Sequence, residues 1–156
     1  MPVFSRLQHS KQRLALVKSP TFEEYGNPDI GFLIGMQIQH THRRMYEKRQ
    51  REAKERQRRR GFPPLDNKSI REAVNLFLKN PMKACRIFGP IEDWNTEKVT
   101  AMYRLFYNAR YFNEDISLWD TGKAGNMESM FQGAVTFDQD IGEWNTSKVN
   151  NIANMF

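Results

Sequence analysis

The chain has 156 residues, of which 39% are hydrophobic and 27% are charged, and its formal net charge is +6. This length and composition are typical of a soluble protein with one domain, or with a small domain and a long extension. The longest apolar run, residues 31–36, is far shorter than the roughly 20 residues that cross a bilayer, and the single cysteine, Cys85, excludes an internal disulfide.

The positive charge is concentrated in one segment of the chain. Residues 43–60 carry 10 basic and 3 acidic groups, whereas residues 89–156 carry 5 basic and 10 acidic groups. Such an asymmetry bears on the partners of a protein more than on its fold. The sequence therefore predicts a basic rod joined to an acidic domain.

Residues 1–39 are predicted to form an extended arm. Their apolar side chains are scattered and interrupted by Pro20 and Pro28, so the arm cannot form a core of its own. The first 20 residues lack the continuous apolar region of a secretory signal, but they also lack acidic residues, which leaves a mitochondrial presequence open. We expect the arm to lie over a partner through the apolar residues Phe4, Leu7, Phe32, Leu33 and Ile34.

Residues 40–61 are predicted to form a basic helix that is polar almost all round. Such a helix is solvated, bridges two bodies or binds along a partner. Three interpretations stay open: a solvated spacer, docking on an acidic protein surface, and neutralisation of nucleic-acid phosphates. Only Tyr46 could stack on a base, which disfavours specific binding of single-stranded RNA. The candidate partner-binding residues of this helix are Arg43, Arg44, Lys48, Arg49, Arg51, Lys54, Arg56, Arg58, Arg59 and Arg60.

Residues 62–68 are predicted to be a linker, stiffened by two consecutive prolines, and residues 69–90 a helical cap. Ser69, followed three residues later by Glu72, matches a capping box at the start of a helix. The pair Asn80-Pro81 either breaks this helix or starts a second short one. A cap is expected here because repeat arrays need an element that covers their end.

Residues 91–156 contain a repeat with a period of 25 residues. Tryptophan, phenylalanine, threonine, isoleucine and lysine each recur three times at this interval without an insertion. The units span residues 91–115, 116–140 and, incompletely, 141–156. Chance does not place so many residue types on one period. The predicted core of the repeats consists of Trp94, Trp119, Trp144, Phe106, Phe131, Phe112, Phe137, Met102 and Met127.

Each unit is predicted to form a short strand, a turn and a helix. Residues 115–120 are apolar residues bounded by turn formers, and Thr121 can then cap a helix. In the first unit the apolar residues recur at helical intervals from Val99 to Ala109. Stacking would bury the apolar faces of these units. The predicted fold class is therefore an α/β repeat, a short solenoid of strand–helix units of the leucine-rich-repeat kind.

The repeat follows the pattern W-[DN]-T-x-x-V-x-x-M-x-x-M-F-x-x-A-x-x-F-[ND]-x-D-I, which resembles that of the BspA-like family. The resemblance covers residues 91–156 and extends back through the helical cap. The sequence departs from it at Ala124, Gly125 and Ile152. The resemblance implies a leucine-rich-repeat-like solenoid. It also implies relatives among bacterial surface proteins, protists and large DNA viruses, with no general enzymatic activity.

No catalytic site, metal site or cofactor is predicted. His40 and His42 are two residues apart and cannot share a helix face, and the third histidine, His9, is remote. The sequence offers no nucleophile with a matching base and no phosphate-binding glycine loop. The recurring Asp115 and Asp140 are predicted to stabilise turns rather than to bind calcium.

An arm without a core and an open repeat end both predict burial by neighbouring proteins; the open-end residues are Ile152, Met155 and Phe156. The expected function is that of a non-catalytic structural subunit of a large assembly. Its most concrete form, by analogy with the distribution of the family, is a minor capsid or virion protein that cements neighbouring subunits. The alternatives are a ribonucleoprotein subunit, for instance ribosomal, and a peripheral subunit of an organellar membrane complex. We expect a virion or cytoplasmic location rather than secretion, with an organelle as the alternative.

Overall fold

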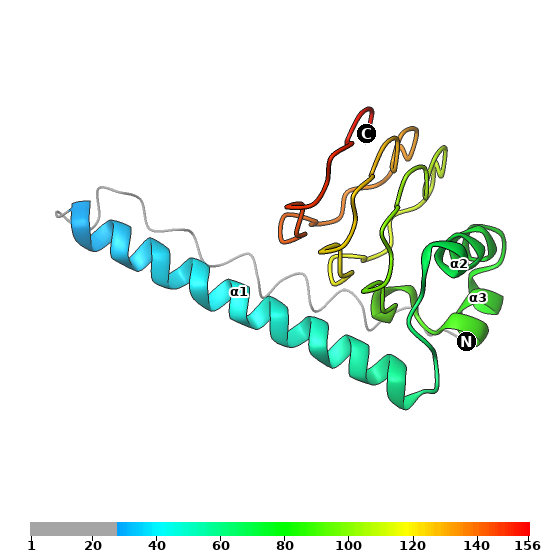
Figure 1. Ribbon diagram of the computed structural model, residues 1–156, viewed down its shortest axis with the longest axis horizontal. Coiled ribbons are helices and arrows are strands. Elements are labelled where there is room, and N and C mark those ends of the chain that lie inside the picture. Colours follow the sequence, from blue (N-terminus) through cyan, green and yellow to red (C-terminus); the bar gives the residue numbers. More distant parts are fainter. Residues whose placement is uncertain (1–27) are drawn as a thin grey trace, which may run out of the picture. The chain divides into compact units, whose positions relative to one another are not determined.

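The computed structural model describes residues 28–156, and Figure 1 shows their helices in chain order. The helices are α1 (Pro28–Arg59), α2 (Asn67–Lys79), α3 (Pro81–Phe88) and a single 3-10 turn, η2 (Ile91–Asp93). The boundary between two compact units, residues 1–41 and 42–156, falls inside α1, so the two units are described separately. The expected arm contacts at Phe4 and Leu7 lie outside the described residues.

Helix α1 begins at Pro28 rather than at residue 40, so residues 28–39 are helical and not part of an extended arm. Proline suits the first position of a helix because its φ is already helical and its missing N–H would have no partner there. The helix ends before Gly61, which has a left-handed φ of 79°. The N–H of Gly61 then bonds to the carbonyl of Arg58 at 3.0 Å, which closes the last turn.

Helix α2 starts with a capping box, but at a different residue from the one expected. Asp66 is the N-cap, and its side chain accepts from the N–H of Lys68 at 3.0 Å and of Ser69 at 2.8 Å. Ser69 completes the box by accepting the N–H of Asp66 at 2.8 Å, so the predicted Ser69–Glu72 box is wrong. The chain is held at this point by the buried Leu65, whose N–H bonds to the carbonyl of Asn95 at 2.8 Å.

The pair Asn80-Pro81 starts the second short helix. Asn80 caps α3 by accepting the N–H of Lys83 at 2.9 Å, and Pro81 takes the first helical position. Helix α2 buries Ile70, Ala73 and Val74 in the same core as the repeats, and α3 adds Ala84 to the buried residues. The helical pair thereby covers the apolar surface at the start of the repeats.

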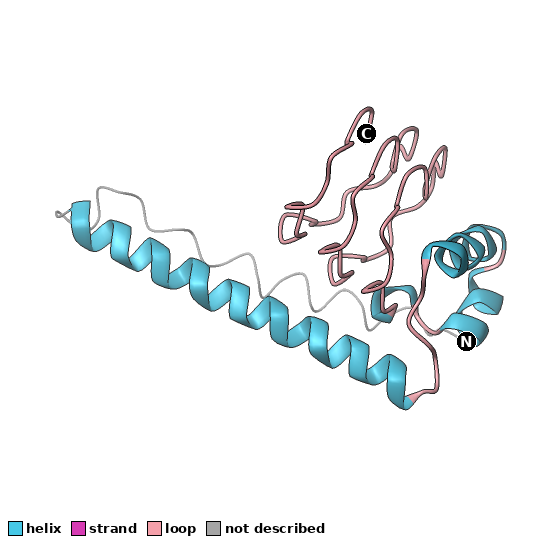
Figure 2. Cartoon of the chain, viewed as in Figure 1, coloured by secondary structure: helices cyan, strands magenta, loops and turns pink. Residues whose placement is uncertain are grey.

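The predicted strand–helix units, and with them the leucine-rich-repeat solenoid, are wrong. From residue 94 to residue 156 the chain contains turns and extended pieces but neither a strand nor a helix (Figure 2). Its only ladder pairings over this range are two isolated parallel bridges, from Ala101 to Asn126 and from Asn126 to Asn151. The repeats instead form three stacked coils, named here coil 1 (residues 91–115), coil 2 (116–140) and coil 3 (141–156).

The coils consist of successive tight turns, and this explains why the apolar spacing imitates a helix. The N–H of Ala109 bonds to the carbonyl of Phe106 at 3.0 Å, and the N–H of Phe112 to that of Ala109 at 3.0 Å. The first and last residues of such turns point inward, so buried residues recur every three positions. The same interval is typical of one face of a helix, and spacing alone cannot separate the two.

Two further features prevent these segments from forming helices or strands. Alternate backbone N–H groups of coil 1 donate to carbonyls of coil 2 at 2.8–2.9 Å, and a helix would need these donors for itself. Arg104, Ser129 and Asn154, one in each coil, have left-handed φ values of 54°, 52° and 53°. Such a residue interrupts both regular conformations. The inter-coil donors of coil 1 are Met102, Arg104, Phe106 and Asn108.

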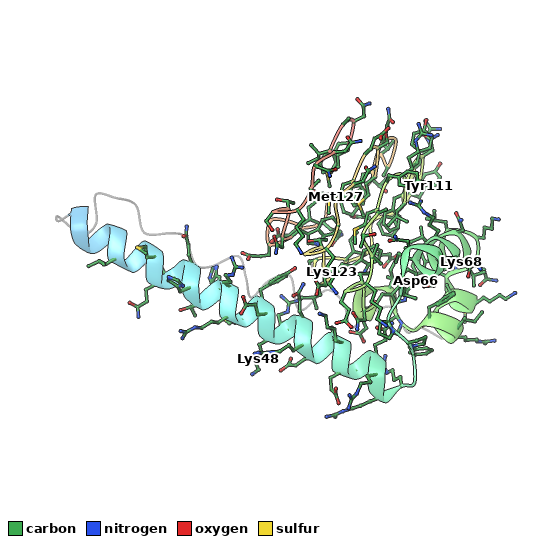
Figure 3. The ribbon with its side chains drawn as sticks, viewed as in Figure 1. Lys48, Asp66, Lys68, Tyr111, Lys123 and Met127 are labelled. Carbon is green, nitrogen blue, oxygen red and sulfur yellow. The ribbon has the colours of Figure 1, made fainter. Side chains whose placement is uncertain are left out.

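Aromatic rings form columns through the stack. Phe106 and Phe131 are parallel with ring centroids 5.5 Å apart, Phe131 and Phe156 follow at 5.7 Å, and Trp94 stacks on Trp119 at 5.8 Å. Met127 lies inside the coils in Figure 3. Of the predicted core residues, Phe137 is partly buried and the others are buried: Trp94, Trp119, Trp144, Phe106, Phe131, Phe112, Met102 and Met127.

Polar side chains of the repeat also join neighbouring coils. The indole N–H of Trp119 donates to the carbonyl of Ile91 at 2.9 Å, one coil back. The hydroxyl of Thr96 donates to the carbonyl of Asp120 at 3.0 Å, and that of Thr121 to Asn145 at 3.1 Å, one coil forward. The expectation that Thr121 caps a helix is therefore wrong, because its hydroxyl links two coils instead.

The recurring aspartates stabilise turns, as predicted. Asp115 accepts the N–H of Ser117, and Asp140 accepts the N–H of Gly142, each at 3.0 Å. This local bond is the ordinary use of an aspartate in a turn.

We expect Phe131→Ala to lower the free energy of unfolding by about 3–5 kcal/mol, because it removes a buried ring between two stacked neighbours. The measurement is denaturant unfolding followed by circular dichroism. Phe156→Ala is the matched control from the same column; this residue is 72% exposed, and its replacement should lower the free energy of unfolding by less than about 1 kcal/mol. Equal losses for the two variants would contradict the stacked core.

Candidate functional site

The basic helix is held against the repeats through a polar face. Tyr46, Gln50, Ala53 and Gln57 are spaced by four, three and four residues, which places them on one side of α1. Ala53 and Gln57 are buried, and Tyr46 and Gln50 are half-buried. The sequence shows no apolar face here because the contact is made by hydrogen bonds. We call these four residues and Lys54 the docking face.

Side chains of the docking face bond to backbone groups of the coils. The hydroxyl of Tyr46 donates to the carbonyl of Ser117 at 3.0 Å, and the amide of Gln50 donates to the carbonyls of Trp119 at 3.1 Å and Leu118 at 3.3 Å. The side-chain oxygen of Gln57 accepts the N–H of Asn95. Because these backbone groups take part in no coil-to-coil bond, the helix satisfies groups that the repeats leave open.

Ion pairs between α1 and the coils join some of the chain's basic residues to some of its acidic residues. The ammonium group of Lys54 lies 2.7 Å from Asp120 and 3.4 Å from Glu97. The guanidinium of Arg56 donates to both carboxylate oxygens of Asp93, with Nε at 3.0 and 3.2 Å. The side chain of Asp93 is only 7% exposed, whereas that of Arg56 is 45% exposed, so only the carboxylate of this pair is shielded from water. The acidic surface expected for the basic helix is thus present in the same chain.

The pair of Lys54 and Asp120 stabilises the charged form of both groups. For Lys54, burial acts to lower the pKa, but the hydrogen bond and charge of Asp120 outweigh it, so the pKa is raised above its usual value of 10.5. For Asp120, burial acts to raise the pKa, but the hydrogen bonds from Lys54 and from the N–H of Gly122 lower it below the usual 3.8. The pair therefore stabilises the fold at pH values between the lowered pKa of Asp120 and the raised pKa of Lys54. This stabilisation is lost when the pH falls through the first pKa or rises through the second.

Tyr46 is the titratable group that burial affects most clearly at this contact. Burial raises its pKa from 10.0 to about 12, and the negative charges of Asp120 and Glu143 act in the same direction. The hydrogen bond from Gln50 acts in the opposite sense but is weaker. Burial and these two carboxylates therefore keep the hydroxyl of Tyr46 protonated to high pH and raise its pKa.

Most of the predicted basic residues remain on the outside of α1. Of the ten, Lys54, Arg56 and Arg60 contact acidic groups of the coils. Some of the others pair with glutamates on the helix itself, as Lys48 does with Glu52 at 3.8 Å, and remain largely exposed. Lys48 points away from the coils in Figure 3. Six of the exposed residues form what we call the outer basic strip: Arg44, Lys48, Arg49, Arg51, Arg58 and Arg59. Arg43 is also exposed, but it lies on the side of α1 that faces coil 3.

The other expected partner-binding residues are distributed unevenly. At the open repeat end, Ile152 and Phe156 are exposed, whereas Met155 is buried in the core. Leu33 is exposed on the first part of α1, and Phe32 and Ile34 also belong to this helix rather than to an extended arm.

An exposed surface of tyrosines on coil 1 was missed by the sequence analysis. Tyr103, Tyr107 and Tyr111 are all exposed, and Tyr111 lies at the end of its coil remote from α1 (Figure 3). The guanidinium of Arg71, from α2, lies 4.0 Å from the ring centre of Tyr103. The repeat pattern could have revealed this surface. The equivalent positions of coil 2 hold glutamate, glutamine and threonine, so the core does not require aromatic residues there.

A cavity of about 510 Å³ lies between α1 and the last coil. Its wall on the helix consists of Arg43, Tyr46, Glu47 and Gln50, and its wall on the coils includes Asp120 and the turn from Gly142 to Ser147. Over residues 28–156 no group of three or more potential metal ligands comes together, and no helix is long and apolar enough to cross a membrane. The wall of the cavity consists mainly of hydrogen-bonding and charged groups.

We expect the pair of Lys54 and Asp120 to have a coupling energy of about 1 kcal/mol in a double-mutant cycle with Lys54→Met and Asp120→Asn at neutral pH. Because the pKa of Asp120 is lowered in the folded state, the coupling should fade as the pH drops through that pKa. It should also fade as the pH rises above 10.5 and through the raised pKa of Lys54, where this side chain loses its charge. The exposed pair of Lys48 and Glu52 is the control, with an expected coupling below about 0.5 kcal/mol.

We expect one tyrosine of the folded protein to ionise near pH 12, and Tyr46→Phe to remove this ionisation. The measurement is the ring-carbon chemical shift of labelled tyrosine followed by NMR as the pH is raised. A pKa raised in the folded state means that the contribution of Tyr46 to stability is present below pH 10 and is lost as the pH rises towards 12. An unchanged high-pH ionisation in the Tyr46→Phe variant would contradict the burial of this hydroxyl.

Comparison with known proteins gives a family but no function. No curated protein and no solved structure matches this chain. The model of one family, described as Mycoplasma protein of unknown function, DUF285, matches residues 75–156. The match covers more than half of the chain and runs from the middle of α2 to the end of coil 3. The chain therefore belongs to the DUF285 family of Mycoplasma proteins of unknown function.

Proposed function

We propose that this protein is a non-catalytic interaction subunit of a larger assembly and that it presents the outer basic strip to an acidic surface of a partner protein. The proposal rests on the attachment of α1 to the coils. Its docking face is attached to coils 1 and 2, so the opposite side of the same helix points outward in a defined orientation. A freely rotating spacer helix would need no such attachment.

The distribution of charge favours a protein partner over nucleic acid for this strip. Glutamates at residues 47, 52 and 55 alternate with the basic groups and pair with several of them. Such a mixed surface complements a mixed protein surface better than a uniform line of phosphates. Tyr46, the aromatic residue of the basic segment, bonds to Ser117 and belongs to the docking face, so it adds no ring to the outer basic strip.

The resemblance of the 25-residue pattern to BspA-like repeats supports the same proposal. Members with this pattern include surface proteins of bacteria and proteins of large DNA viruses. A minor capsid or virion protein that cements neighbouring subunits is therefore the most concrete form that we propose. This step is an analogy with relatives rather than a property of the site.

The second candidate is a ribonucleoprotein subunit, and the exposed tyrosines of coil 1 favour it. Tyr103 and Tyr107 each lie beside a guanidinium, of Arg71 at 4.0 Å and of Arg104 at 5.1 Å. Aromatic rings interleaved with arginines are typical of surfaces that stack single-stranded bases. This surface is separate from the outer basic strip, so the two candidates can be tested with different variants.

We expect the Arg44→Glu/Lys48→Glu/Arg51→Glu variant to bind labelled polyglutamate at least about tenfold more weakly than the wild-type chain, measured by fluorescence anisotropy at low salt. The matched control makes the same charge change on the helical cap, with Lys68→Glu, Lys79→Glu and Lys83→Glu, and should have a smaller effect. Oligouridine is the competing probe. Tight binding of oligouridine that survives the strip variant but is lost on replacing the three exposed tyrosines with alanine would favour the ribonucleoprotein.

A further inference from the structure

The cavity lies between α1 and coil 3. At the equivalent position of coil 2, one period earlier, side chains of α1 occupy the space. In coil 2 the carbonyls of Ser117, Leu118 and Trp119 accept hydrogen bonds from Tyr46 and Gln50. The equivalent residues of coil 3, one period of 25 residues later, are Gly142, Glu143 and Trp144, and all three line the cavity. No donor among the described residues bonds to their carbonyl oxygens. The repeat thus places the same set of acceptors at the cavity without the donors that α1 supplies to coil 2.

The charges around the cavity leave one carboxylate without an opposite charge. Of the carboxylates in its wall, Glu47 pairs at 3.2 Å with Arg43, which also lines the cavity, and Asp120 pairs with Lys54 at 2.7 Å. The third, Glu143, is exposed and has no ion pair with any residue that the structure describes. An occupant of this cavity would therefore be favoured by a positive charge.

We propose that this cavity binds the guanidinium group of an arginine side chain. A guanidinium carries five N–H donors in a planar fork and no acceptor, which suits a wall that offers several carbonyls and one unpaired carboxylate. Its flat face can also stack on an aromatic ring, and Tyr46 lines the cavity. A lysine ammonium has only three donors and does not stack in this way, so arginine is preferred over lysine.

The volume of the cavity is large enough to hold a side chain of another molecule. Its volume of about 510 Å³ is within the roughly 300–1,000 Å³ typical of ligand sites. This is enough for an arginine side chain and the adjoining peptide groups. The source that fits the proposed function is an arginine-bearing segment of a partner protein, and the choice of that source rests on the proposed function. The guanidinium chemistry does not depend on it.

The test uses the full chain and N-acetyl-arginine amide as the probe, followed by ¹⁵N-resolved NMR. We expect the amide signals of residues 142–147 to shift on titration. N-acetyl-citrulline amide, which has the same shape without the charge, should leave them almost unchanged. Glu143→Gln should weaken the binding of the arginine probe by about tenfold. Because Glu143 is exposed, this variant should fold, and its circular dichroism spectrum checks that it does.

Glu72→Gln is the matched control, because this glutamate is also exposed but lies on α2, outside the cavity wall. It should bind the probe as the wild type does. The inference is overturned if the shifted signals lie elsewhere, if citrulline binds equally well, or if Glu143→Gln and Glu72→Gln behave alike. The strip variant Arg44→Glu/Lys48→Glu/Arg51→Glu changes none of the cavity residues, so failure of the proposed function would not remove this binding.

A further variant tests whether the arginine comes from this chain or from a partner. In it, Arg6 and Arg13 of the same chain are both replaced by glutamine. Stronger binding of the probe to this variant than to the wild type would show that an arginine of the chain itself competes for the cavity. Such a result would support the guanidinium chemistry and exclude a partner as its sole source. Equal binding would exclude Arg6 and Arg13 as occupants and favour an arginine of a partner protein.

Discussion

The attachment of a polar helix face to backbone groups of two neighbouring coils is the contact on which the arrangement of charge in this protein depends. Amide and hydroxyl groups of α1 complete hydrogen bonds that the coils leave open, and Lys54 and Arg56 neutralise acidic groups beside them. A contact of this kind gains little from the removal of apolar surface from water. It depends instead on the geometry of its hydrogen bonds, because a buried polar group without a partner is costly. The helix is therefore fixed in rotation as well as in position.

This attachment also divides one charged helix into two sides with different roles. Residues spaced by about one turn on the inner side face carbonyls and carboxylates, whereas the outer side keeps its arginines and lysines in water. The repeat stack acts as a support whose core is aromatic, with Phe106 and Phe131 buried in one column that the exposed Phe156 continues. Three acidic residues of the coils, Asp93, Glu97 and Asp120, pair with the basic segment, so only part of that segment remains for a partner.

The sequence predicted the repeat period and the residues that point inward, but not the backbone that carries them. Tryptophan and phenylalanine at intervals of 25 residues show which side chains meet. They do not show whether Met102 and Phe106 belong to a helix or to two consecutive turns, since both place these side chains inward. The left-handed Arg104 could not be foreseen, because arginine has no preference for that conformation. The docking face was missed for a related reason: Gln50 and Gln57 carry no periodic apolar signal, and their partners are backbone groups of residues far away in the chain.

The hydrogen bonds between coils have a consequence for how such a chain can change over evolutionary time. Each of the N–H groups of Met102, Phe106 and Asn108 is matched to one carbonyl of the following coil. A single inserted residue would shift every later pair out of register and turn inward-facing side chains towards water. The loss or gain of a whole coil would preserve all of these matches. Length should therefore vary in this family in steps of 25 residues, and each step would add another set of carbonyls along the side that faces the helix.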